Sequence, residues 1–263
     1  QDAGVPGQQQ AIGLVEVDRD IDLGQGPGHD VGHTDLGGVE VVMEQPGQGH
    51  FLDAPDGVLL FSDVSGDSVY RWTAKDGVTL DGWAMYPPDF DAKKQWPVLF
   101  HVYGEPWSQT VKDTWFLGHH LFHRWLTQKG YVVMSVDARG TPAPKGRDWR
   151  KALYQKIGVT SSLDWDQATD ALCTQHSWMD KKRLAIWGWS GGGAMTLNMM
   201  FRYPDRFAAG MSVAPVTDIG LYDTIYQERY CGDPREVPDV YVQCSPITFA
   251  KDLKGALLLV HGT

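Results

Sequence analysis

Cysteine is scarce in this chain. Among its 263 residues only Cys173, Cys231 and Cys244 are cysteines. They are too few and too irregularly spaced for a disulfide framework or a zinc site. Cys231 and Cys244 could pair, although spacing alone does not show it. We predict instead that all three are buried free thiols.

Other features are missing altogether. The sequence contains no run of 18 apolar residues, so no membrane span is predicted. Residues 1–10 lack the charged-then-apolar order of a signal peptide. No phosphate-binding loop, dinucleotide fingerprint or metal-spaced cluster occurs, so we expect no cofactor and no metal. No basic patch suggests nucleic acid as a partner.

The N-terminal segment has no aromatic residue. Residues 1–50 hold eleven Gly, seven Gln and nine acidic residues, but only one basic residue, Arg19. The net charge of the segment is −8, out of −10 for the whole chain, so the acidity describes this segment and says nothing of a substrate. With little apolar surface to offset ordering entropy, we predict a weakly ordered extension over residues 1–67. A translation product from outside the true reading frame is the alternative.

The rest of the chain, residues 68–263, has the pattern of an α/β domain. Strands are predicted over 69–73, 79–86, 97–103, 131–137, 183–188, 208–214 and 256–261. Helices are predicted over 116–129, 163–175 (opened by Ser161 or Ser162), 194–201 and 221–230. Alternating strands and helices favour a doubly wound, mostly parallel sheet. We therefore predict one domain of the α/β-hydrolase type after the extension, with a sheet that is incomplete at its C-terminal end.

The most informative motif is Gly188-Trp189-Ser190-Gly191-Gly192. It follows an apolar strand and precedes a helix, which is the arrangement of a nucleophile elbow. A tight turn needs small residues, and it lifts the serine hydroxyl out of the sheet edge. The first N–H groups of the next helix then point at the same place. Ser190 is therefore the predicted nucleophile of an acyl-transfer reaction, and a structural turn with an idle serine is the alternative.

Several segments carry a family resemblance. They are Val102-Tyr103-Gly104-Glu105-Pro106, Asp137-Ala138-Arg139-Gly140-Thr141, the elbow itself, Val213-Ala214-Pro215-Val216, Tyr226-Gln227-Glu228-Arg229-Tyr230 and Leu259-Val260-His261-Gly262-Thr263. In this order and spacing, residues 68–263 resemble the catalytic domain of the prolyl oligopeptidase superfamily, and in particular its dipeptidyl peptidase IV branch. Gly191 and the helix end at 199–204 resemble bacterial members.

The resemblance implies roles for individual residues. Tyr103 and the N–H of Gly191 would form the oxyanion hole beside Ser190. Val216, Tyr222 and Tyr226 would line the pocket for the residue before the cleaved bond, where aromatic faces suit a proline ring. The implied activity is a serine exopeptidase that releases N-terminal dipeptides, or tripeptides in a related branch, after Pro or Ala.

The sequence departs from the family at three of these positions. Ile219 stands where many members have a bulky aromatic residue, which predicts a wider pocket. Glu105 replaces a small residue near the oxyanion turn. Gly191 replaces the tyrosine of animal members, a change expected to be harmless because only its N–H is used.

A serine nucleophile also needs a histidine base and an acid that orients it. The family places both beyond the His261-Gly262-Thr263 segment, so the triad Asp and His are absent from residues 1–263, and we expect this stretch alone to be inactive. His101, His119, His123, His176 and His261 are expected to be structural or surface residues. The family's propeller domain, which binds the substrate amine, is not recognised in the N-terminal residues.

Two other functions remain open from the sequence. One is a broad esterase or acyl-peptidase with the same elbow, and the other is a non-catalytic interaction module. The resemblance further implies peptide substrates, frequent homodimers, and a periplasmic or secreted location, although the compartment stays unknown without a signal peptide.

Overall fold

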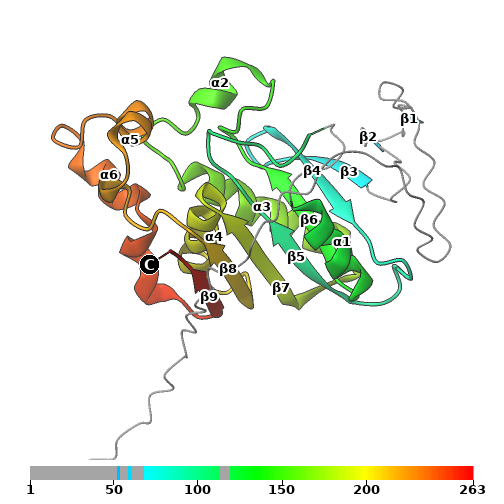
Figure 1. Cartoon of the computed structure of the whole chain (residues 1–263). Coiled ribbons are helices and arrows are strands. Elements are labelled where there is room, and N and C mark those ends of the chain that lie inside the picture. Colours follow the sequence, from blue (N-terminus) through cyan, green and yellow to red (C-terminus); the bar gives the residue numbers. More distant parts are fainter. Residues whose placement is uncertain (1–51, 54–58, 61–67, 113–118, 263) are drawn as a thin grey trace, which may run out of the picture.

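The described part of the chain forms one twisted sheet of seven strands, in the order β3-β4-β6-β5-β7-β8-β9 (Figure 1). The computed structural model describes residues 52–53, 59–60, 68–112 and 119–262. Two short strands of two residues each, β1 and β2, precede this sheet in sequence and pair with each other. The predicted weak order of residues 1–50 lies outside the described residues.

The elements follow one another as strand, helix and strand over most of the chain. The strands are β1 (Leu52–Asp53), β2 (Leu59–Leu60), β3 (Ser68–Thr73), β4 (Thr79–Met85), β5 (Trp96–His101), β6 (Val132–Asp137), β7 (Met179–Trp189), β8 (Ala209–Val213) and β9 (Ala256–Val260). The α-helices are α1 (His120–Gln128), α2 (Gly146–Lys151), α3 (Thr160–Gln175), α4 (Gly191–Arg202), α5 (Thr224–Cys231) and α6 (Pro238–Cys244). Two 3-10 helices, η1 (Ile219–Leu221) and η2 (Pro246–Asp252), complete the set.

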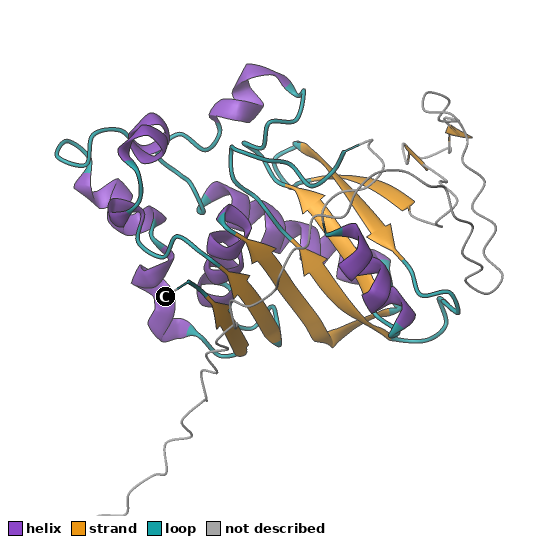
Figure 2. Cartoon of the chain, viewed as in Figure 1, coloured by secondary structure: helices purple, strands orange, loops and turns teal. Residues whose placement is uncertain are grey.

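The sheet is parallel over its larger part. Strands β6, β5, β7, β8 and β9 pair in parallel, whereas β3 and β4 pair antiparallel and β4 runs antiparallel to β6. Parallel neighbours require crossover connections, and helices supply most of them (Figure 2). The carboxyl ends of the five parallel strands therefore meet at one edge.

Helices cover both faces of the sheet. On β5 the neighbouring residues Phe100 and His101 point to opposite faces, as successive strand residues must. The Phe100 ring meets Trp165 of α3 edge-on, with the centroids 5.7 Å apart. The His101 ring lies 4.8 Å from the ring of His123 on α1. The sheet is thus doubly wound, with α1 on one side and α3 on the other.

Three helix boundaries differ from the sequence expectations for physical reasons. Helix α4 begins at Gly191, three residues early, because the elbow glycines form its first turn. Helix α3 begins at Thr160, and neither Ser161 nor Ser162 caps it. The expected helix over 221–230 is divided, because the Asp223 carboxylate accepts from the N–H of Tyr226 and starts α5 anew.

The cysteine prediction is confirmed. Cys173, Cys231 and Cys244 are free and buried. No helix in the part of the chain that the structure describes is both long and apolar enough to cross a bilayer.

A cluster of histidine and tryptophan rings lies beneath α1. His123 is buried and its ring packs 5.5 Å from that of Trp83 and 5.5 Å from that of Trp187. Nε2 of His123 and Nδ1 of His101 have no hydrogen-bond partner among the described residues. Burial lowers the pKa of His123 to about 3 and holds that of His101 well below its usual value. Both rings are therefore neutral at neutral pH.

Replacing His123 with phenylalanine should make the protein more resistant to acid. The folded-state pKa lies below the unfolded value of roughly 6.5, so the unfolded chain takes up the proton first as pH falls. The free energy of unfolding of the wild-type protein therefore falls from about pH 6.5 downwards, by roughly 2 kcal/mol at pH 5. Urea unfolding of both proteins at pH 7 and pH 5 should show that the relative stability of His123→Phe rises by that amount. Parallel pH dependences of the two proteins would contradict this expectation.

Candidate active site

Two neighbouring parallel strands bring Ser190 and Tyr103 to the same edge of the sheet. Ser190 follows β7 and Tyr103 follows β5, and the two strands pair with His101 opposite Trp187. The N–H of Val102 donates to the carbonyl of Trp187 at 2.9 Å, which continues the pairing to the strand ends. The two side chains that were predicted to act together therefore leave the sheet side by side.

The backbone of Ser190 has the conformation of a strained turn. Its φ is 59° and its ψ −118°, values that a residue with a side chain rarely adopts. The N–H of Ser190 donates to Val213 at 2.8 Å, and its carbonyl accepts from Ala194 at 3.0 Å. These bonds tie the turn to β8 and to α4, and the residue itself is exposed. Ser190 is held rigidly where a substrate can reach it.

The glycines of the elbow are required by close backbone approach. A Cβ added to Gly192 would lie 2.2 Å from the carbonyl oxygen of Val102. A Cβ on Gly188 would meet the Gly192 carbonyl at 2.4 Å, and one on Gly193 would meet that of Val213 at 2.6 Å. Backbone atoms cannot move aside cheaply, so the motif reflects packing between β5, β7 and β8 at the elbow.

The side chain of Ser190 lies near enough to the Tyr103 phenol to oppose the rise in the pKa of that phenol. Burial, with help from Glu105 and Tyr222, raises the pKa of Tyr103 to about 12, so the phenol keeps its proton. Gly191 is the first residue of α4, and the first N–H groups of a helix have no partner within it. A phenol and a backbone N–H thus lie near Ser190, and both are of the donor type that an oxyanion hole uses.

Of the three residues expected to line a pocket, Val216 precedes η1, Tyr222 directly follows η1 and Tyr226 lies on α5. The rings of Tyr222 and Tyr226 meet edge-on at 5.9 Å, and Tyr230 packs against Tyr226 at 4.9 Å. Val216 and Tyr226 pack against a small second core. Tyr222 keeps 46% of its surface exposed, so one aromatic face remains available to a ligand.

Ile219 lies deeper than the pocket residues. It is buried in the second core, whose members are Leu153, Ile157, Ile219, Cys231, Tyr241 and Cys244. The wider pocket inferred from this position stays a prediction.

Sequence reasoning marked Glu105 as a departure but gave it no role. The hydroxyl of Tyr226 donates to the carboxylate of Glu105 at 3.0 Å. A Cβ on Gly191 would lie 2.7 Å from the same carboxylate oxygen and 3.1 Å from Cζ of Tyr103. A side chain at 191 would therefore require the Glu105 carboxylate to move, so Gly191 matters for more than its N–H. An acidic residue inside a Gly-Pro turn was the signal available in the sequence.

The loop that follows Tyr103 and Glu105 is anchored by Asp137 at the end of β6. Its buried carboxylate accepts from the N–H of Thr110 at 2.8 Å, from the Thr110 hydroxyl at 3.0 Å and from the N–H of Val111 at 3.1 Å. Burial outweighs these bonds and raises the pKa of Asp137 to about 6. Asp137 therefore holds this loop in place at Thr110 and Val111.

Replacing Asp137 with alanine should destabilise the protein by about 2–4 kcal/mol, because two backbone donors and a hydroxyl lose their buried acceptor. Asp137→Asn keeps one acceptor oxygen and should cost clearly less. Chemical denaturation of the two variants beside the wild type measures both costs. Equal stability of the alanine variant and the wild type would show that the loop does not depend on this anchor.

The histidines of the described residues occupy other places. His119 and His123 pack against Trp187, and His119 also stacks on Trp189 at 6.3 Å. His261 follows β9, and its ring contacts the carbonyl of Gly262. The described residues contain no group of three or more metal-binding side chains.

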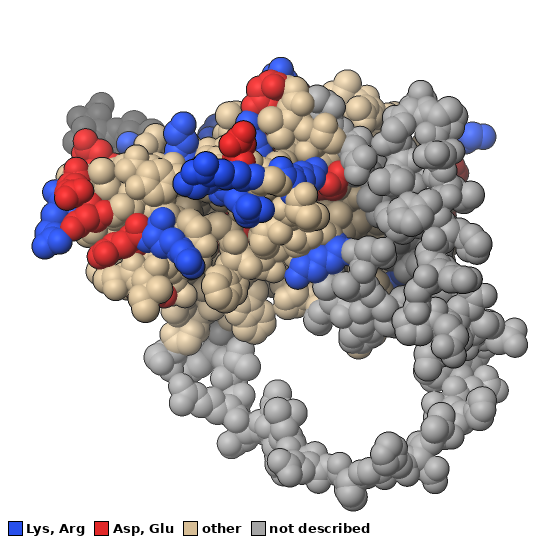
Figure 3. Space-filling view, turned by 90° about the horizontal axis from the view of Figure 1, so that it is seen from above, with Lys and Arg blue, Asp and Glu red and all other residues tan. Residues whose placement is uncertain are grey.

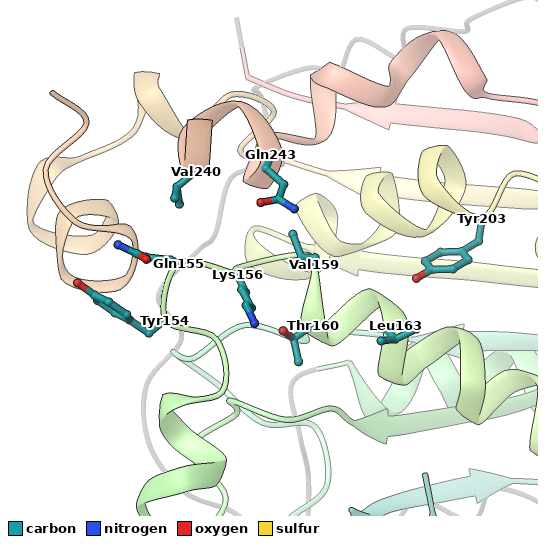
Figure 4. Close-up of a pocket in the computed structure, with 9 residues that line it drawn as sticks. All are labelled: Tyr154, Gln155, Lys156, Val159, Thr160, Leu163, Tyr203, Val240 and Gln243. Carbon is teal, nitrogen blue, oxygen red and sulfur yellow. The ribbon is translucent and has the colours of Figure 1, made fainter. Parts of the chain in front are cut away.

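A separate groove lies on another part of the surface (Figure 4). Tyr154, Lys156, Leu163, Tyr203 and Gln243 are among the residues that line it. It contains neither Ser190 nor the aromatic residues of α5.

The face seen in Figure 3 mixes basic and acidic side chains.

Comparison with known proteins decides the family. The model of the prolyl oligopeptidase family matches residues 121–263. The chain belongs to the prolyl oligopeptidase family. Two curated relatives, from Fusarium vanettenii and Aspergillus clavatus, are named dipeptidyl-aminopeptidase B. They are 41% identical over 71% of this chain and 39% identical over 74% of it.

Solved structures of the family confirm the α/β-hydrolase fold. Porphyromonas gingivalis dipeptidyl peptidase 4 is 38% identical with a TM-score of 0.70, and a dipeptidyl aminopeptidase IV structure from Bacteroides ovatus is 33% identical with a TM-score of 0.71. Each comparison covers 74% of this chain, but only 27% and 28% of those chains. The chain spans about one fifth of the length of the curated relatives it matches.

Proposed function

We propose that the protein is a serine exopeptidase that releases N-terminal dipeptides after Pro or Ala. The observation that carries the proposal is the strained, exposed Ser190, with the Tyr103 phenol near its side chain and the N–H of Gly191 directly after it in the chain. Ser190 attacks the peptide carbonyl, and the two donors stabilise the negative oxygen that forms. The family relationship supplies the peptide as the substrate class.

The aromatic residues on α5 and just before it support a preference for proline immediately before the cleaved bond. Tyr222, Tyr226 and Val216 offer ring faces and one aliphatic group, which suit a compact apolar ring such as proline. Release of dipeptides rather than tripeptides rests on the names of the relatives.

The experiment compares three chromogenic substrates. The family places the acid and base beyond Thr263, so the assay uses the longest natural form of the protein. Gly-Pro-p-nitroanilide should be cleaved with a much higher kcat/KM than Gly-Gly-p-nitroanilide, and p-nitrophenyl acetate should react weakly. Strong hydrolysis of the acetate with none of the anilide would favour a broad esterase. Loss of both reactions would favour a non-catalytic module.

A further inference from the structure

We propose that Glu105 is a positioning residue of the substrate pocket, which holds the Tyr226 phenol and closes the space left open by Gly191. The inference rests on the proposed function, because it concerns the pocket of the same reaction. Glu105 comes from the turn after β5 and Tyr226 from α5, so the contact joins two segments 121 residues apart in sequence.

The geometry around Gly191 carries the first step. The carboxylate oxygen of Glu105 lies 2.7 Å from the place where a Cβ of residue 191 would stand, and the Tyr103 ring lies 3.1 Å from it. The carboxyl group therefore occupies the volume that a side chain at 191 would take. It lies against the oxyanion turn on one side and against the pocket tyrosines on the other.

Tyr226 is held both at its hydroxyl and at its ring. The hydroxyl donates to Glu105 at 3.0 Å, and the ring packs between those of Tyr222 and Tyr230. A phenol fixed at both its ring and its oxygen presents one defined face to the pocket. Without the carboxylate the ring would lose its polar anchor, and the pocket would gain the volume of the missing side chain.

The surroundings of Glu105 also make the contact sensitive to pH. Its titratable neighbours are Tyr103 on its own turn and Tyr226 and Cys231 on α5. Burial raises the pKa of Glu105 to about 7, and the hydrogen bond from Tyr226 opposes that shift. Above this pH the ionised carboxylate accepts the phenol proton more strongly, so the phenol is held more tightly.

The test compares Glu105→Ala and Glu105→Gln in the longest natural form of the protein. The alanine variant should raise KM for Gly-Pro-p-nitroanilide about 10-fold and change kcat little, because pocket contacts are lost equally from substrate and transition state. Its preference for Pro over Leu before the cleaved bond should fall about 10-fold. Glutamine keeps the volume and an acceptor, so it should restore KM and the preference to within about 3-fold.

The pH profile separates positioning from a merely structural role. In the wild type KM should fall as pH rises through about 7, and this change should be absent from Glu105→Gln. Glu236→Ala removes an exposed glutamate and serves as the matched control, with kinetics like those of the wild type. Equal KM, preference and pH profile in the wild type and Glu105→Ala would overturn the proposal.

A second measurement does not need activity. With [ζ-13C]tyrosine, the Tyr226 signal, assigned by its loss in Tyr226→Phe, should move across pH 7 in the wild type and stay in place in Glu105→Gln. An unmoved signal in the wild type would overturn the proposal. A moving signal together with no cleavage of Gly-Pro-p-nitroanilide would support the Glu105 contact and refute the proposed peptidase function instead.

Discussion

Replacing Ser190 with alanine should lower kcat for Gly-Pro-p-nitroanilide on the order of 10⁶-fold, because the nucleophile that forms the acyl-enzyme is gone. The remaining rate would come from binding and from the oxyanion donors alone. The measurement is the steady-state hydrolysis of the anilide by the purified longest natural form, with enough enzyme to detect the residual rate.

A folding control is needed, because the residue lies in a strained turn. Ser190 accepts from Ala194 and donates to Val213 through its backbone, and alanine keeps both bonds. The thermal unfolding midpoint should therefore stay close to that of the wild type. Activity that persists in a folded Ser190→Ala variant would remove Ser190 from the mechanism.

Replacing Tyr103 with phenylalanine should lower kcat by about 10²–10³-fold, with a small change in KM. In the proposed mechanism the phenol donates to the oxygen that becomes negative only as the carbonyl is attacked, so its loss should cost about 3–4 kcal/mol in the transition state. The pKa of about 12 means that this donor stays protonated throughout the working pH range. Parallel measurement of kcat and KM on the anilide checks the split.

The matched variant for this experiment is Tyr131→Phe. Tyr131 is an exposed tyrosine that precedes β6, away from the elbow in sequence and in the sheet. It should show wild-type kinetics. If Tyr103→Phe affected KM instead of kcat, the phenol would serve substrate binding rather than the oxyanion.

Much of this arrangement could be predicted from sequence because it depends on local patterns. The apolar runs gave the strands of the parallel sheet, and the glycines around Ser190 indicated a turn between strand and helix. The family resemblance then singled out Tyr103, Tyr222 and Tyr226 as candidates, whereas local patterns alone would have assigned Tyr222 and Tyr226 to a core. The structure brings these residues together at one sheet edge.

Other features depend on contacts between distant segments. The bond from Tyr226 to Glu105 spans 121 residues, and a charged residue in a turn does not reveal its partner. Helices α2 and α6 were missed because they have six and seven residues, too few for a clear periodic pattern. The hydrogen bonds from Thr110 to Asp137 were not predicted either, because they also join residues that are distant in sequence.

The crowding between Glu105 and Gly191 also restricts how this site can evolve. A side chain gained at 191 while Glu105 is present collides with the carboxylate at 2.7 Å, unless the glutamate moves away from Tyr226. Loss of Glu105 while Gly191 remains leaves an unfilled space beside the oxyanion turn. A change at either position alone therefore disturbs the packing at the other position. The effect of a substitution at 191 depends on the residue at 105. We expect a bulky residue introduced at 191 in this chain to be tolerated better when Glu105 is replaced by a small residue at the same time.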